Sequence, residues 1–241
     1  MKPQVVIERQ PEEWIRGLPL PRVTDVLRVM DKPALVGWAA KMATEYMGGV
    51  LEPGRAYSAP ELNAFLTAAK SAHRDRSRAA ADKGTEAHKW IQSDAYGQTL
   101  PMPEDPDVAS SVNAYLEWKT QHDVEFVESE LPFAHEELGF KGTLDCLAWV
   151  DSVFTLIDIK TSSGIYVEAY LQTAAYQKGV EPLIRSGQKI EQRIILHIPK
   201  DGRAANAITL ATDIEEDWQG FRACLNLKRY LDYQKAATAK R

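Results

Sequence analysis

Two aspartates and a lysine near the middle of the chain have the types and spacing to bind a metal ion and a phosphate. Asp145 ends the segment 142–145, and Asp158 and Lys160 lie in the apolar segment 153–160. Side chains alternate between the two faces of a strand, so Asp158 and Lys160 share one face while the isoleucines beside them point toward a core. The sequence therefore predicts a strand face that carries a carboxylate and an ammonium group.

A tight hairpin turn would bring the two aspartates together. A two-residue turn after Val150 pairs it with Val153, so the numbers of paired residues sum to 303. Asp145 and Asp158 also sum to 303, and this register places them opposite each other with Cβ atoms about 4.5–5.5 Å apart. A longer turn or a bulge would shift the alignment, so the register is a hypothesis.

Facing carboxylates destabilise a sheet unless a cation offsets their repulsion. A divalent cation, which prefers oxygen ligands, would offset this repulsion. Such a metal binds a phosphate oxygen and lowers the pKa of a coordinated water, while a lysine stabilises developing negative charge. The pattern therefore predicts phosphodiester hydrolysis. The alternative is a surface hairpin whose aspartates and lysine are solvated.

Further candidate residues lie in segments with a helical pattern. His88 follows a glycine by one helical turn, and Gln172 and Tyr176 share a helix face because they are four residues apart. The alternatives are a structural histidine and a helix that packs Tyr176 and exposes Gln172. The densest basic run precedes His88 and reads as a DNA-phosphate track or as a solvated helix face. The run consists of Arg74, Arg76, Arg78 and Lys83.

In their order and spacing these segments resemble the PD-(D/E)xK nuclease superfamily, and more narrowly its RecB-type exonuclease branch. That branch includes phage-encoded exonucleases and the mitochondrial genome-maintenance exonuclease. The similar segments are residues 84–88, 142–145, 158–162 and 172–176, and residues 23–38 also resemble the branch. The resemblance implies an α/β fold with a restriction-endonuclease-like core, in which helices flank a central mixed sheet and a helical N-terminal region precedes it.

The resemblance also implies roles for individual residues. Asp145, Asp158, the Ile159 carbonyl and His88 would bind Mg²⁺ or Mn²⁺, and Lys160 would be the catalytic lysine. The residues that would position or contact DNA are Gln172, Tyr176, Thr161, Ser162, Arg74, Arg78 and Lys83.

Two positions fit the superfamily pattern less directly. Glu130 occupies a place where the branch often carries an acidic residue, and its role stays open. Leu144 stands where the superfamily name expects a proline.

Composition excludes several other classes of protein. The share of hydrophobic residues, 44%, and the net charge of −5 argue against disorder and against a broadly basic phosphate binder. Two cysteines, Cys146 and Cys224, cannot ligate the iron–sulfur cluster of some relatives, and no phosphate loop indicates a helicase motor. No apolar run predicts a membrane span or secretory signal, so we expect a bacterial or phage-infected host cytosol.

The surrounding pattern predicts a mainly helical part over residues 1–122 and a sheet-containing catalytic core over 123–241, together one nuclease domain over 1–241. Residues 1–22 are expected to be an irregular arm. Helices are expected from 24, over 33–47, from 58 to 91 with a break at 83–84, and over 107–121, 167–180 and 213–234. Strands are expected over 124–133, 139–150, 153–159, 193–199 and 204–210.

The function predicted from the sequence is a metal-dependent DNA exonuclease in recombination, repair or phage DNA processing. It would act on single strands or duplex ends. The alternatives are a structure-specific or restriction-like endonuclease and a non-catalytic nucleic-acid-binding protein with the same fold. The sequence predicts neither cleavage polarity nor oligomeric state.

Overall fold

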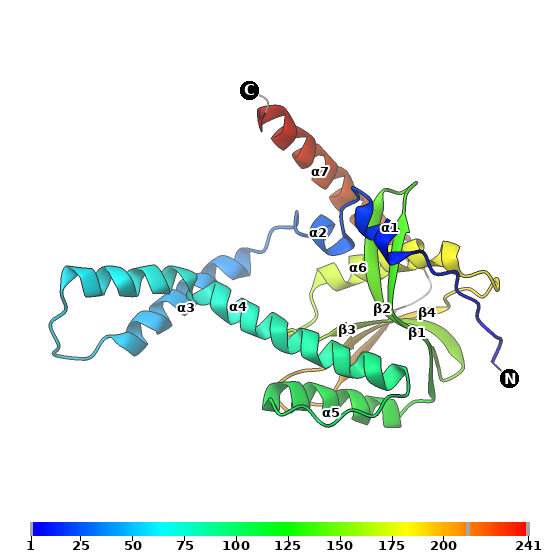
Figure 1. Cartoon of the computed structure of the whole chain (residues 1–241), viewed down its shortest axis with the longest axis horizontal. Coiled ribbons are helices and arrows are strands. Elements are labelled where there is room, and N and C mark those ends of the chain that lie inside the picture. The colour runs from blue at the N-terminus through cyan, green and yellow to red at the C-terminus, as the bar shows by residue number, and fades with distance from the viewer. Residues whose placement is uncertain (1, 211–212, 240–241) are drawn as a thin grey trace. The chain divides into compact units, whose positions relative to one another are not determined.

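The computed structural model describes residues 2–210 and 213–239, and its contacts divide the chain into two compact units (Figure 1). Unit 1 comprises Met1–Met30 and Glu86–Arg241, and unit 2 comprises Asp31–Thr85. The expectation of one nuclease domain over residues 1–241 stays a prediction.

The centre of unit 1 is a five-stranded mixed sheet in the order β1-β2-β3-β4-β5. Neighbouring strands are antiparallel except β3 and β4, which are parallel because the chain crosses over through helix α6 between them. The strands are β1 Val124–His135, β2 Phe140–Val150, β3 Val153–Lys160, β4 Gln192–His197 and β5 Asn206–Leu210.

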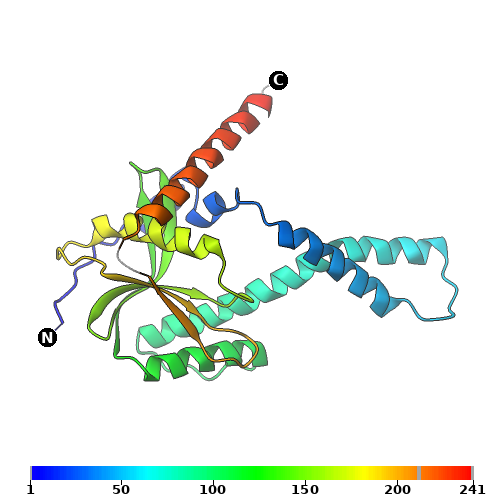
Figure 2. The same ribbon diagram turned by 180° about the vertical axis from the view of Figure 1, so that it is seen from behind.

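Helices cover both faces of this sheet (Figure 2). One face packs against α2, α6 and α7, with Phe133, Leu156 and Phe221 in its core. The other packs against α5 and the last turns of α4, with Ile157 and Ile159 in its core. The helices of unit 1 are α1 Glu12–Gly17, α2 Val23–Leu27, α5 Pro106–Thr120, α6 Val167–Val180, the 3₁₀ helix η1 Glu181–Leu183 and α7 Glu215–Ala239. The predicted α/β fold, with a central mixed sheet flanked by helices, is confirmed.

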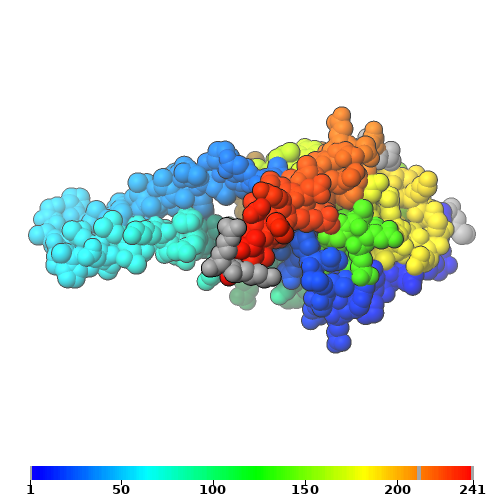
Figure 3. Space-filling view, turned by 90° about the horizontal axis from the view of Figure 1, so that it is seen from above, coloured from blue at the N-terminus to red at the C-terminus, as the bar shows by residue number. Residues whose placement is uncertain are grey.

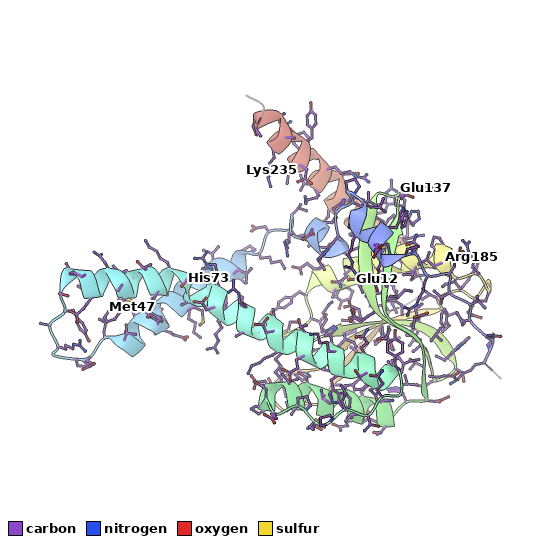
Figure 4. The ribbon with its side chains drawn as sticks, in the orientation of Figure 1. Glu12, Met47, His73, Glu137, Arg185 and Lys235 are labelled. Carbon is purple, nitrogen blue, oxygen red and sulfur yellow. The ribbon has the colours of Figure 1, made fainter. Side chains whose placement is uncertain are left out.

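Unit 2 consists of α3 (Pro33–Val50) and the first part of α4 (Ala59–Ala95). The two helices contact each other where the ring of Trp38 meets that of His73, 6.4 Å apart (Figure 4). The start of α4 is a capping box, because Ser58 N donates to Glu61 Oε2 at 2.8 Å while Glu61 N donates to Ser58 Oγ at 3.4 Å. The predicted helix start at Ser58 is therefore confirmed.

The N-terminal arm is more ordered than expected. It forms the helix α1, and Ile7 and Arg22 make isolated β-bridges to the rest of unit 1. The ammonium group of Lys141 donates to carbonyl oxygens at the end of α1, at 2.8 Å from Ile15 O and 2.7 Å from Leu18 O. The expectation of an irregular arm over residues 1–22 holds for most of the described residues 2–22 and was wrong for α1, whose contacts to the rest of the unit cannot be read from the arm itself.

The structure differs from one predicted helix end, at residue 47, and from the predicted helix break at residues 83–84. Helix α3 continues through Gly48 and Gly49 to Val50, and α4 runs without interruption through Gly84. A glycine costs a helix only about 1 kcal/mol relative to alanine, which the surrounding turns can offset. A lone glycine is therefore a weak stop signal.

Helix α7 lies on the surface of unit 1 (Figure 3). Its first half buries Trp218, Phe221 and Leu225, whereas Tyr230 and Tyr233 beyond them are exposed. Across the residues that the structure describes, no helix is both long enough and apolar enough to cross a membrane.

Candidate functional site

The hairpin of β2 and β3 carries the two aspartates, and its register follows the predicted sum. Val150 pairs with Val153, and the ladder continues to the pair Cys146 and Ile157. There the described ladder ends, one residue before Asp145 and Asp158. The Asp145 carboxylate instead accepts a hydrogen bond from Ile159 N at 2.7 Å. The predicted register is confirmed. The two aspartates themselves are not paired in the described ladder, because the Asp145 side chain accepts a hydrogen bond from the β3 backbone there.

Asp145 belongs to a cluster that could hold a metal ion. His88 Nδ1 lies 3.8 Å from Asp145 Oδ2 and 3.8 Å from Glu130 Oε1. One potential ligand atom from each of the three residues lies within 4.8 Å of the others, and all three are partly buried. The cluster joins the last part of α4 with the edge strand β1 and its neighbour β2.

Glu130 enters this cluster through the irregular geometry of β1. Its neighbours pair with β2 as Ser129 with Cys146 and Leu131 with Leu144, so Glu130 stands opposite Asp145. The φ angle of Glu130 is 49°, a left-handed conformation that few residues other than glycine adopt. Such strain persists where the surrounding structure determines it, and it is frequent at functional sites. The sequence left the role of Glu130 open. A predicted pairing register for β1 and β2 would have placed Glu130 opposite Asp145, and so in the same site.

Asp158 forms a second group of polar contacts beside this cluster. Its side chain is 0% exposed. Lys160 Nζ donates to Asp158 Oδ1 at 2.8 Å, and Gln172 Nε2 donates to the same atom at 2.9 Å. Gln172 Nε2 also lies 2.8 Å from the hydroxyl oxygen of Tyr176. The predicted sharing of one helix face by Gln172 and Tyr176 is thus seen in α6, with both side chains buried.

One oxygen of Asp158 has no hydrogen-bond donor among the described residues. Oδ2 lies 2.7 Å from Lys160 Nζ, but only Oδ1 receives that donor with hydrogen-bond geometry. A buried carboxylate oxygen left in this way is costly unless a cation or water satisfies it. The ammonium group of Lys160 compensates the charge of this oxygen, which still has a lone pair that could serve a metal ion.

The charges of the metal cluster and of the Asp158–Lys160 pair affect each other's pKa values. Burial raises the pKa of Asp158 to about 6, the charge of Lys160 opposes this shift, and the charge of Asp145 adds to it. Burial would lower the pKa of His88, but the charges of Asp145 and Glu130 outweigh it and raise that pKa. Burial also raises the pKa of Tyr176, so its hydroxyl stays protonated. The site thus concentrates negative charge that a divalent cation would offset.

The residues predicted to contact DNA fall into two places. Thr161 and Ser162 lie in the loop that follows β3, next to Lys160. Arg74 and Arg78 are exposed on α4, and with Lys83 they belong to unit 2. Their predicted role as a track toward the site therefore stays a prediction.

A groove with a cavity volume of about 620 Å³ lies beside Tyr176 in unit 1. Its lining includes Arg16, Arg22 and Lys141, the carboxylate of Glu12 and the hydroxyl group of Thr143. Arg16 pairs with Glu12 at 2.7 Å, and Lys141 donates to backbone carbonyls of the α1 segment. Sequence reasoning missed this groove, because its cations come from α1, from the residue before α2 and from β2. Arg22 and Thr143 supply the charge and the hydroxyl group with which this groove could contact a phosphate.

The donor set fits Mg²⁺ or Mn²⁺. Carboxylate oxygens are the ligands these hard cations prefer, and an imidazole nitrogen is compatible with Mn²⁺. The Ile159 N–H points to the edge of β3 at which Asp145 lies, and within a strand the carbonyl of a residue faces the same edge as its N–H. The residues present therefore fit the predicted metal, with Glu130 as an additional oxygen donor.

No protein-family model matches the sequence, and no curated protein matches it. Among solved structures, the chain is similar to an alkaline exonuclease, LHK-Exo from Laribacter hongkongensis, with 16% identity over 95% of this chain and 100% of that one and a TM-score of 0.40. The same exonuclease in complex with dAMP gives 16% identity, the same coverage and a TM-score of 0.37. SSO0001 gives 14% identity over 84% of this chain and 88% of that one, with a TM-score of 0.28.

Proposed function

We propose that this protein is a metal-dependent DNA exonuclease of the PD-(D/E)xK superfamily that hydrolyses phosphodiester bonds at the ends of single-stranded or duplex DNA. The observation that carries the proposal is that two groups of polar side chains lie together at the end of the β2–β3 ladder. One group is the possible metal cluster of His88, Glu130 and Asp145. The other is the buried ion pair of Asp158 and Lys160.

The metal cluster would hold Mg²⁺ or Mn²⁺ through His88, Glu130 and Asp145, with Asp158 Oδ2 and the Ile159 carbonyl as further ligands. When bound, the ion would lower the pKa of a coordinated water and polarise the scissile phosphate. Asp145 would be held in place for this role by the N–H of Ile159, which donates to its Oδ2 at 2.7 Å.

Lys160 would stabilise negative charge that develops on the phosphate. Its ammonium group is oriented before substrate arrives, because it donates to Asp158 Oδ1 at 2.8 Å and to Gln172 Oε1 at 3.3 Å. Preoriented donors stabilise a transition state without having to reorganise. Gln172 and the hydroxyl of Tyr176 would position the DNA backbone or the attacking water.

The groove beside Tyr176 would hold the phosphate backbone of the DNA next to the reacting bond. Arg22 and Thr143 line it, and Thr143 lies two residues before Asp145 on the same strand. The position of Thr143 supports a path in which a DNA strand runs along β2 toward the metal cluster. A role in recombination, repair or phage DNA processing is part of the proposal.

The test compares linear with circular single-stranded DNA of the same sequence, with Mg²⁺ or Mn²⁺ and with chelator. Metal-dependent loss of only the linear form would support an exonuclease. Loss of both forms would instead favour an endonuclease, and loss of neither would favour a non-catalytic DNA-binding protein. Asp145→Asn is the control for contaminating nuclease and should be inactive on both substrates. End-labelling at 5′ and at 3′ then gives the polarity.

A further inference from the structure

His197 stands directly beside Lys160 on the sheet. It is the last residue of β4, and in the parallel ladder Lys160 pairs with His197. Residues that pair in a ladder point to the same face, and neighbouring strands lie about 4.8 Å apart. His197 therefore lies on the α6 face of the sheet, the face that carries Asp158 and Lys160.

The side chain of His197 binds the backbone of the loop that leaves β3. Its Nε2 lies 2.7 Å from the carbonyl oxygen of Ser162, and only 6% of the residue is exposed. A carbonyl oxygen can only accept, so Nε2 carries the hydrogen and donates it. One residue further on, Ile198 N donates to the Lys160 carbonyl at 2.8 Å. The end of β4 thus binds the carbonyl oxygens of Lys160 and of Ser162, two residues further along the chain.

Among the described residues, the side-chain hydrogen bonds that Ser162 and Ser163 make stay close to the loop. Ser162 Oγ donates to Gly164 O at 2.7 Å, and Ser163 Oγ lies 2.8 Å from the hydroxyl of Tyr166, so these contacts remain within the loop and the residue that precedes α6. Ser162 and Ser163 themselves are exposed. A loop of this kind is mobile unless a buried group fixes it. His197 is a buried side chain that contacts it.

We infer that His197 is a positioning residue of the proposed nuclease site. It fixes the loop over residues 161–164 so that Thr161 and Ser162 meet the DNA backbone next to Lys160. The inference rests on the proposed function for its effect on catalysis, whereas the ordering of the loop by His197 is independent of any activity.

Two amide variants separate this role from simple packing. In His197→Gln the side-chain nitrogen extends about as far from the backbone as Nε2 of histidine, so it can still donate to Ser162 O. In His197→Asn the same amide group is one carbon shorter and cannot reach. The Lys160 main chain keeps its bond from Ile198 N in both variants. We therefore expect His197→Asn to act on DNA binding more than on the chemical step.

The experiment uses the full-length chain and has two readouts. In hydrogen exchange without metal, His197→Asn should speed exchange in peptides that cover residues 161–166 and leave α5 peptides unchanged, while His197→Gln should resemble the wild type. In steady-state cleavage of single-stranded DNA with Mn²⁺, His197→Asn should raise KM about tenfold, the effect of one lost hydrogen bond, with kcat changed less than about threefold. His197→Gln should stay within about twofold of the wild-type KM.

The outcomes separate failure of this inference from failure of the proposed function. Wild-type exchange rates in the loop of His197→Asn, or faster exchange throughout the unit, would overturn the inference whether or not the protein cleaves DNA. An active wild type whose KM does not change in His197→Asn would overturn it as well. A wild-type protein that cleaves no DNA would refute the proposed function, and with it the effect on KM, while the exchange data would still decide whether His197 orders the loop.

Discussion

At the residue scale, the polar groups of the site hold one another in defined positions. Asp158 is fully buried, and its Oδ1 accepts from both Lys160 and Gln172. Removal of one partner of such a network leaves another buried group unsatisfied. Substitutions in the site should therefore be compared at the level of both activity and stability.

Lys160→Ala should reduce the rate of cleavage at saturating DNA by about 10²–10³-fold, the usual loss when one donor to a developing negative charge is removed. DNA affinity should change much less, because the lysine acts mainly on the transition state. Single-turnover rates and equilibrium DNA binding measure the two effects. Lys235→Ala, at an exposed lysine of α7 (Figure 4), is the matched control and should resemble the wild type. A near wild-type rate in Lys160→Ala would remove Lys160 from the mechanism.

Glu130→Gln should weaken metal binding by about 10–100-fold, a loss comparable to that from removing groups that support a metal site. The amide keeps the shape of the side chain but lacks the charge that the cation needs. The measurement is the Mn²⁺ concentration that gives half-maximal cleavage. Glu125→Gln, an exposed glutamate on the same strand, is the control. Equal Mn²⁺ requirements for the two variants would show that Glu130 is not a ligand.

At the element scale, the start of α4 depends on the capping box of Ser58 and Glu61. Ser58→Ala removes a cap and should destabilise the first turns of α4 by about 1 kcal/mol. Hydrogen exchange of peptides at the start of α4 measures this. Ser77→Ala, an exposed serine within the same helix, should have no such effect. Exchange that is unchanged in Ser58→Ala would mean that contacts elsewhere in unit 2 determine where α4 begins.

The exposed arginines of α4 should contribute to DNA affinity if they contact phosphates. Arg74→Glu with Arg78→Glu should weaken single-stranded DNA binding and reduce the slope of log affinity against log salt by roughly 1.4, because each phosphate contact on a single strand contributes about 0.7. The rate at saturating DNA should change little. Arg222→Glu with Lys235→Glu on α7 is the charge-matched control. An unchanged slope would show that Arg74 and Arg78 do not contact phosphates and belong to a solvated helix face.

At the scale of the whole molecule, metal binding should stabilise the folded chain. Ligand atoms of His88, Glu130 and Asp145 lie within 4.8 Å of one another in the folded state, so a cation would bind that state in preference to the unfolded chain. At 100 times its dissociation constant, a ligand adds about 2.7 kcal/mol. For a unit of this size, that corresponds to a rise in Tm of roughly 5–10 °C.

Thermal unfolding with Mn²⁺ should therefore show this rise in the wild type, and chelator should reverse it. Asp145→Asn should lose most of it, because it removes a charge from the metal cluster. Asp201→Asn, at an exposed aspartate paired with Arg203, should keep it. A full metal-dependent rise in Asp145→Asn would place the metal ligands elsewhere.

Local patterns in the sequence determined the parts of the site that lie within single elements and one short hairpin. Alternation along β3 placed Asp158 and Lys160 on one face, the two-residue turn set the β2–β3 register, and helical spacing brought Gln172 and Tyr176 together. Each of these follows from backbone periodicity over a few residues, which tertiary contacts did not override.

Only the tertiary structure decided which distant residues complete the site. Glu130 reaches the cluster through a left-handed backbone conformation after a bulge in β1, and His197 reaches the loop after Lys160 through a parallel pairing that needs a crossover of more than thirty residues. The β2–β3 ladder ends at Cys146, and the Asp145 side chain then accepts from the β3 backbone at Ile159 N. None of these has a local signature, because bulges, long-range pairing and the burial of a carboxylate arise from packing between elements and not from the periodicity of any one of them.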